Sequence, residues 1–160
     1  MCYHLRKVGA VGVKAPNPKR KNNFKTRFKY GLRFPSDYRE FLLNFNGGRP
    51  DKWEFRFKGK RTYTECVHYF LSMSDDPDIS FHVYFQRYKV DDKCLADGLI
   101  PVAFDPGGNL ICLSILGEKQ GGVFFWDHET ETSGRGERGE NLRVITDSFR
   151  EFIDGLEGEE

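Results

Sequence analysis

The sequence predicts an α+β fold, in which a mainly antiparallel sheet of about four to six strands is flanked by helices. The length of 160 residues supports one folded domain with a core. A 15% aromatic fraction that includes 15 Phe is too high for a disordered chain. Apolar residues recur at helical spacing on both sides of a block of short apolar runs, which is typical of helices around a sheet.

The first predicted helix begins near Pro35, which suits a first helical turn, and Asp37 favours the positive end of the helix dipole. Apolar side chains follow at i, i+3, i+4 and i+7, namely Tyr38, Phe41, Leu42 and Phe45. Asn46, Gly47 and Gly48 end the helix, because glycine takes the left-handed position without a Cβ clash.

A hairpin and a second helix are predicted next. Residues 53–57 alternate apolar and charged side chains, and a turn at Gly59 and Lys60 leads to a β-rich run over 67–71. Residues 75–78, Asp-Asp-Pro-Asp, indicate a helix start. The side chains beyond it fit helical spacing at Phe81, Tyr84, Phe85 and Tyr88, or strand spacing at Phe81, Val83 and Phe85, and the helix is preferred.

Three apolar runs, over 99–104, 110–116 and 123–126, are separated by turn residues and predict an antiparallel meander. The polar stretch 129–140 is predicted to be a surface loop. Thr146, Asp147 and Ser148 then cap a closing helix whose apolar positions are Phe149, Phe152, Ile153 and Leu156.

The net charge of +1 conceals an uneven distribution along the chain. Residues 1–33 hold ten Lys and Arg and no acid, which leaves 15 basic and 24 acidic residues beyond them, a balance of −9. Residues 1–31 are therefore predicted to form a basic N-terminal arm, and residues 32–157 a single domain.

The basic arm interleaves Phe24, Phe28 and Tyr30 with Lys and Arg. Such a composition can contact a nucleic-acid backbone and stack on bases. A solvated tail is the simpler interpretation, because nothing in the rest of the chain repeats a nucleic-acid-binding motif.

The cysteines indicate reduced thiols, since Cys2, Cys66, Cys94 and Cys112 form no C-x-x-C pair and have no histidine at metal-ligand spacing. Cys112 lies in an apolar run and is predicted to be a core residue. No apolar stretch approaches the roughly 18 residues of a membrane span, and no signal-peptide pattern is present. A cytoplasmic protein is expected.

No catalytic, cofactor-binding or metal-binding residue is predicted. His4, His68, His82 and His128 lie far apart in sequence and outside any zinc motif. Serine nucleophile elbows and phosphate-binding loops are absent. The aspartates of residues 75–78 resemble the opening of a calcium loop, but the glycine and terminal glutamate of that loop do not follow, so helix capping is the preferred interpretation.

Two segments are candidates for partner contact. Trp126, Asp127 and His128 place an aromatic, an acid and an imidazole at a strand end; an acid–base pair is conceivable there, but no nucleophile or second carboxylate accompanies it. The loop Gly47-Gly48-Arg49 is the second candidate, with Trp126 and Arg49 as the expected anchors. The structural alternative is that the glycines only end a helix and that Trp126 is a core residue.

Four segments, in order, resemble one known family. They are Leu32–Pro50, with its Phe-Pro-Ser-Asp-Tyr helix start and Asn-Gly-Gly end; Gly98–Asp105 with Gly108–Leu113; Val123–Glu129; and Ser148–Ile153. Together they cover most of 32–156 and are similar to the SUKH superfamily, specifically its Smi/Knr-type group. Members of that group usually carry an amphipathic first helix, so residues 1–31 are expected to be either a basic arm or a divergent form of that helix.

The resemblance implies an α+β fold and a protein-binding role. Many bacterial members resemble immunity proteins, which bind the toxin domain of a secreted effector, often a nuclease; fungal relatives act in cell-wall regulation. We therefore expect a non-enzymatic immunity protein that neutralises a cognate toxin domain, and an acidic surface would attract a basic nuclease. The alternatives are a regulatory or scaffolding protein without a toxin partner, contacting nucleic acid through the arm, and a hydrolase.

Overall fold

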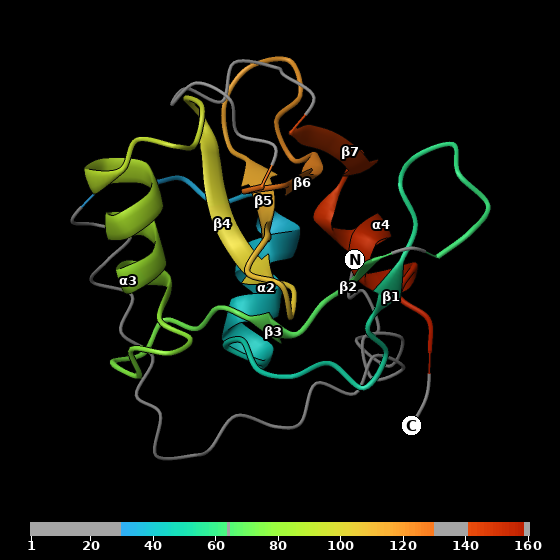
Figure 1. Cartoon of the computed structure of the whole chain (residues 1–160). Coiled ribbons are helices and arrows are strands. Elements are labelled where there is room, and N and C mark those ends of the chain that lie inside the picture. The colour runs from blue at the N-terminus through green and yellow to red at the C-terminus, as the bar shows by residue number, and fades with distance from the viewer. Residues whose placement is uncertain (1–29, 64, 130–140, 159–160) are drawn as a thin grey trace.

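A five-stranded antiparallel sheet organises the computed structural model, which describes residues 30–63, 65–129 and 141–158 (Figure 1). The strand order is β3-β4-β5-β6-β7, and every neighbouring pair is antiparallel. The strands are β3 (Tyr69–Phe70), β4 (Leu99–Phe104), β5 (Leu110–Ser114), β6 (Val123–Trp126) and β7 (Leu142–Thr146). The predicted fold class is confirmed, as is the meander from β4 to β6.

The sheet is covered on both faces, so β4, β5 and β6 are buried almost throughout. Side chains alternate between the faces along β6, because successive Cβ atoms of a strand point to opposite sides. Val123 and Phe125 join the larger core with the helices α2 and α4, on what we call the helical face. The other side, which we call the front face, holds a second cluster formed by Leu95, Leu99, Leu110, Cys112, Phe124 and Trp126.

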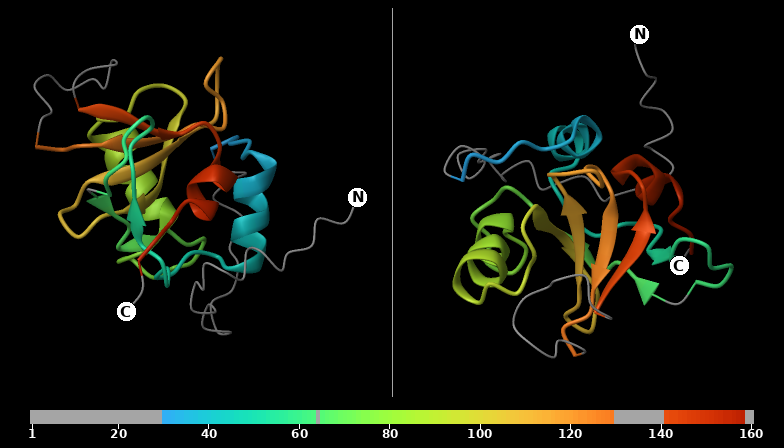
Figure 2. Two further views of the ribbon diagram at one scale, coloured as in Figure 1. Left: turned by 90° about the vertical axis from the view of Figure 1, so that its right-hand side faces the viewer. Right: turned by 90° about the horizontal axis from the view of Figure 1, so that it is seen from above.

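The helices α2 (Ser36–Asn44) and α4 (Phe149–Asp154) lie side by side on the helical face (Figure 2). Both were predicted, and α4 begins at Ser148, whose Oγ accepts a hydrogen bond from the Glu151 N–H at 3.1 Å. The rings of Tyr38 and Phe149 meet edge to face with centroids 5.0 Å apart, which joins the two helices.

The third helical segment, α3 (Phe81–Phe85) continuing as the π-helical η2 (Gln86–Asp91), confirms the helical interpretation of this region. The predicted start at residues 75–78 is wrong, because the helix begins only at Phe81. The Ser72 N–H donates to the Ile79 carbonyl at 2.7 Å, and the Phe81 N–H donates to the Ser72 carbonyl at 2.9 Å. These bonds hold residues 79–81 against the chain that leaves β3, so the preceding turn cannot join the helix.

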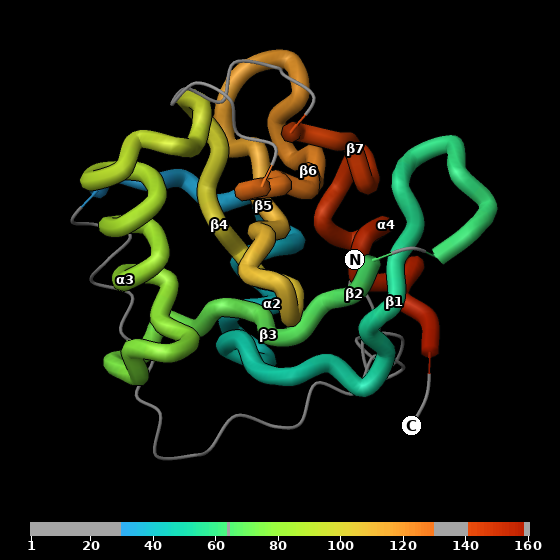
Figure 3. Tube along the Cα trace, in the orientation of Figure 1, coloured from blue at the N-terminus to red at the C-terminus, as the bar shows by residue number. Residues whose placement is uncertain are grey.

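The predicted hairpin is only partly correct. The short strand β1 (Glu54–Phe55) pairs with β2 (Glu65–Cys66) in a separate two-stranded sheet, whereas the end of the expected second strand is β3, in the main sheet. Figure 3 traces the chain from β2 through β3 to α3. Strand β7 was not predicted. The surface loop expected over 129–140 lies outside the described residues from residue 130 on, and the basic arm lies outside them up to residue 29.

The described cysteines and helices can be compared with what the sequence predicted for Cys112 and for membrane spans. Cys112 is fully buried, as predicted, and no disulfide joins the described cysteines Cys66, Cys94 and Cys112. Among the helices of the described ranges, none is long and apolar enough to cross a membrane.

Candidate partner-binding face

The two predicted contact segments do not lie together. Gly48 bridges Phe70 at the outer edge of β3, whereas Trp126 ends β6, and β3, β4 and β5 separate the two. At one strand spacing per step, the separation is about 19 Å. A single contact patch cannot be built from these two segments without the surface between them.

The Gly47–Gly48 loop holds β3 in place. Gly47 is buried with φ +78°, and a Cβ atom there would lie 2.6 Å from the Leu71 carbonyl oxygen. Gly48 donates to the Phe70 carbonyl at 3.0 Å and accepts from the Phe70 N–H at 2.9 Å. Of the three predicted residues of this loop, only Arg49 has an exposed side chain.

Trp126 is 2% exposed and packs in the front-face cluster, with its ring centroid 5.9 Å from that of Tyr88. Its indole N–H has no hydrogen-bond partner among the described residues. The side chain therefore acts as a core residue in the free chain, which is the structural alternative that the sequence left open.

Asp127 is half-buried and His128 is exposed, directly after β6. His128 Nδ1 lies 2.7 Å from Asn109 Oδ1, and the Asn109 Nδ2 group donates to Asp105 Oδ2 at 2.8 Å. Because the amide nitrogen faces the carboxylate, the amide oxygen faces the ring and accepts from Nδ1. The buried Asp105 thus orients an exposed imidazole through Asn109.

Three carboxylates approach one another near this end of the sheet. Burial raises the pKa of Glu65, and the charges of Asp105 and Asp127 raise it further, whereas Arg143 opposes the shift. Arg143 Nη2 lies 3.8 Å from Glu65 Oε1, and its guanidinium carbon lies 3.8 Å from the centre of the Phe57 ring. With one cation for three carboxylates, this region is acidic. Within the described ranges no group of three metal-binding side chains is found.

A strip of partly exposed aromatic rings crosses the front face beside these residues. It consists of His68, Tyr69, Phe104, Tyr84 and Tyr88, and we call it the aromatic strip. The rings of Tyr69 and Phe104 have centroids 6.1 Å apart, those of Phe104 and Tyr84 5.2 Å apart, and those of Tyr84 and Tyr88 5.9 Å apart. Trp126 supports the Tyr88 end of the strip from within the core.

Sequence reasoning missed the aromatic strip, because it needs β3 and α3 to lie beside β4, and both are long-range arrangements. The only local signal is the i, i+4 spacing of Tyr84 and Tyr88, which was used to predict the helix.

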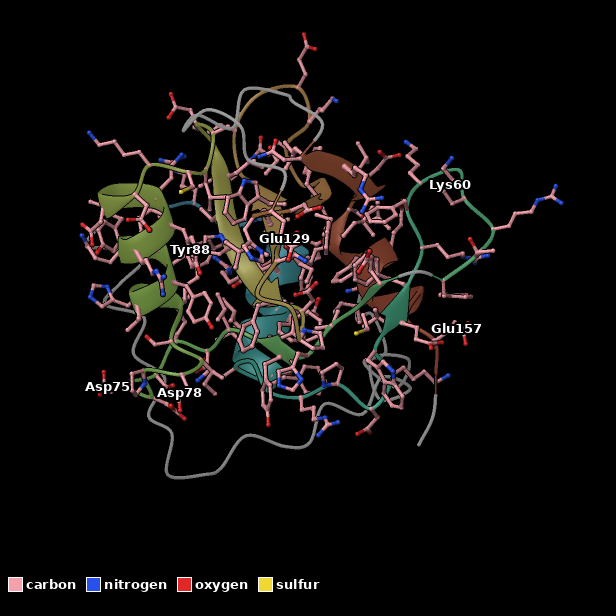
Figure 4. All side chains as sticks on the ribbon, in the orientation of Figure 1. Lys60, Asp75, Asp78, Tyr88, Glu129 and Glu157 are labelled. Carbon is pink, nitrogen blue, oxygen red and sulfur yellow. The ribbon has the colours of Figure 1, made fainter. Side chains whose placement is uncertain are left out.

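Acidic residues lie at the lower end of α3, next to the aromatic strip. Figure 4 shows Asp75 and Asp78 below α3, Tyr88 between α3 and the sheet, and Glu129 in front of the sheet. Burial raises the pKa of Tyr84, the neighbouring Tyr88 adds to this, Arg87 opposes it, and the charge of Asp78 raises it further. Asp78, in the turn before α3, is thus close enough to Tyr84 for its charge to act on the aromatic strip.

A groove of about 350 Å³ lies at the opposite end of the front face. Leu99, Phe124 and Leu142 line its apolar part, and Lys119 Nζ lies 5.9 Å from the centre of the Phe124 ring. Leu116, also in the lining, is 64% exposed. The front face therefore offers apolar contact area at both ends.

Comparison with known proteins identifies the chain's relatives. Residues 25–155 match the model of the SMI1 / KNR4 family (SUKH-1), a range that includes every described element from α2 to α4. The chain is also similar to the SPbeta prophage-derived uncharacterized protein YokK of Bacillus subtilis (strain 168), with 26% identity over 145 residues that cover 79% of this chain and 68% of that protein. No solved structure matches the chain.

Proposed function

The chain belongs to the SMI1/KNR4 family (SUKH-1), and we propose that it is an immunity-type protein that binds and neutralises a cognate toxin domain. The observation that carries the proposal is the front face, where partly exposed aromatic rings lie among carboxylates. Protein interfaces are enriched in tyrosine and other aromatic residues, and a few such side chains supply most of the binding free energy.

The charge balance favours a basic partner such as a nuclease. The chain beyond residue 33 carries a formal charge of −9, and the carboxylates include Asp75 and Asp78 below α3 and Glu129 in front of the sheet. Complementary potentials accelerate encounter and exclude partners of the wrong sign. Neutralisation would then consist of covering the active face of the toxin, with no reaction catalysed by this chain, in the cytoplasm.

Of the predicted contact residues, Asp127 and His128 fit this role best. The Asp105–Asn109 pair holds the His128 ring in one orientation, so its Nε2 atom can meet a partner without a further loss of side-chain freedom. Arg49 is exposed at the far edge of β3 and would contact a partner large enough to span the sheet. Gly47, Gly48 and Trp126 would support the face from behind.

Co-expression tests the proposal. The full chain is produced together with the toxin domain encoded beside it in the source genome, and growth is compared with that of cells producing the toxin domain alone. We expect restored growth and a stable complex on size-exclusion chromatography. Cells that die in both cases, with no complex on the column, would reject the proposal.

A second candidate function rests on the concentration of ten basic residues in 1–33. A regulatory protein that contacts nucleic acid through this segment would bind DNA or RNA in low salt and lose affinity steeply as salt rises, because binding releases counterions. A gel-shift titration of the full chain tests this second function, and a chain that binds no nucleic acid at low salt would exclude it.

A further inference from the structure

Three rings of the aromatic strip are stacked nearly parallel. The planes of Tyr69 and Phe104 differ by 21°, and those of Phe104 and Tyr84 by 13°. All three side chains are partly exposed. The exposed parts of these rings offer a site for a flat cation, which is attracted to the negative face of an aromatic ring.

The molecule already uses this contact elsewhere. The guanidinium carbon of Arg56 lies 4.8 Å from the centre of the Tyr63 ring, that of Arg143 lies 3.8 Å from the Phe57 ring, and that of Arg87 lies 5.1 Å from the Tyr88 ring. Arg87 thus occupies one end of the aromatic strip. No arginine or lysine of the described ranges lies over the rings of Tyr69, Phe104 or Tyr84.

A carboxylate lies near one of these rings, and further acids are exposed on the same side of the chain's fold or follow β6. Asp75 and Asp78 are exposed in the turn that precedes α3, and the charge of Asp78 acts on Tyr84. On the other side, Asp127 and the exposed Glu129 follow β6. A guanidinium group can stack on a ring and donate paired hydrogen bonds to a carboxylate at the same time, which the compact ammonium of lysine cannot do.

We infer that the aromatic strip is a docking site for an arginine-bearing segment of the protein partner, with guanidinium groups packed against the exposed parts of Tyr69, Phe104 and Tyr84 and paired with the carboxylates of Asp75 and Asp78. The inference rests on the proposed function, since it names the chemistry of the partner at the same face. It also selects arginine over lysine, which the charge balance alone does not.

The test uses the full chain and two synthetic peptides of equal charge, deca-arginine and deca-lysine, in calorimetric titrations at low salt. We expect deca-arginine to bind several-fold more tightly than deca-lysine. The double variant Tyr69→Leu/Tyr84→Leu keeps apolar bulk but removes two rings, and should reduce affinity for deca-arginine about threefold to tenfold while reducing that for deca-lysine less.

Matched controls separate the site from general effects. Tyr63→Leu, on the β1–β2 hairpin, should leave peptide binding unchanged. Asp75→Asn/Asp78→Asn should weaken binding more than Asp154→Asn/Glu157→Gln, which removes the same charge at α4 and just beyond it; Figure 4 shows Glu157 far from Tyr88. Near-native circular dichroism spectra and melting temperatures show that each variant is folded.

Equal affinity for the two peptides, or unchanged deca-arginine binding by the Tyr69→Leu/Tyr84→Leu variant, would overturn the inference. So would a concentration-dependent dimer of the native chain that this variant abolishes, because a second copy would then occupy the strip. Unchanged affinity of the folded double variant for the toxin domain would also refute it while leaving the proposed function intact, whereas failure of the native chain to rescue growth concerns the proposed function alone.

Discussion

Replacing Gly47 with alanine tests whether the Gly47–Gly48 loop is needed for folding. Gly47 and Gly59 have the same φ of +78°, but their surroundings differ. A Cβ atom on Gly47 would lie 2.6 Å from the Leu71 carbonyl oxygen and 2.7 Å from that of Phe70, whereas a Cβ atom on Gly59 would meet nothing within 4 Å. Gly59→Ala is therefore a matched control that carries the backbone strain without the clash.

The expected cost follows from two contributions. A left-handed conformation costs an alanine about 1–2 kcal/mol, and this applies to both variants. At Gly47 the backbone of β3 must also move, which breaks the pair of hydrogen bonds between Gly48 and Phe70, each worth about 1 kcal/mol. We expect Gly47→Ala to lose about 3–4 kcal/mol of unfolding free energy and Gly59→Ala about 1–2 kcal/mol.

Urea unfolding monitored by tryptophan fluorescence measures both variants. The midpoint should fall further for Gly47→Ala, with an unchanged slope, because the surface exposed on unfolding stays the same. Equal losses in the two variants would refute the close approach of this loop to β3. A Gly47→Ala chain of native stability that fails to bind its partner would instead show that Gly47 is a contact residue.

Three further predictions concern buried or paired polar groups. Tyr38→Phe should leave the melting temperature unchanged or raise it, since the buried hydroxyl has no partner among the described residues; a clear drop would contradict this. Asn109→Ala should cost about 2 kcal/mol of unfolding free energy, because the buried Asp105 loses the Asn109 Nδ2 donor and keeps only the backbone N–H of that residue; native stability would show that the side-chain bond is weak. The pKa of Glu65 is raised above its ordinary 4.5, so the folded chain binds that proton more tightly than the unfolded chain does. The free energy of unfolding should therefore fall as pH rises above about 4.5. Glu65→Gln should make this fall smaller, and an unchanged pH profile of the variant would contradict the prediction.

The elements that sequence reasoning predicted correctly are those whose pattern and turns are local. Helix α2 carries its apolar stripe, its N-terminal proline and its terminating glycines within residues 35–48, and α4 carries its own cap at Ser148. The strands from β4 to β6 are joined by short turns, so neighbours in sequence are neighbours in the sheet.

The errors arose where pairing is not local. Strand β7, with the sequence Leu-Arg-Val-Ile-Thr, alternates between the faces of the sheet, but it follows a long polar stretch that gives no indication of its partner. Residues 67–71 read as a hairpin partner of 53–57, yet β4 offers Tyr69 and Phe70 a longer apolar strand, so β3 joins the main sheet. The start of α3 depends on the bonds between Ser72 and residues 79–81, which no local pattern shows.

The consecutive residues Trp126, Asp127 and His128 do not form one exposed group. Neighbouring side chains of a strand point to opposite faces, so Trp126 lies in the front-face cluster, where Tyr88 covers it. Asp127 and His128 follow the strand end, and only His128 is exposed. The buried indole supports the Tyr88 ring of the aromatic strip from behind. A substitution at Trp126 would therefore affect partner binding indirectly, by shifting the Tyr88 ring.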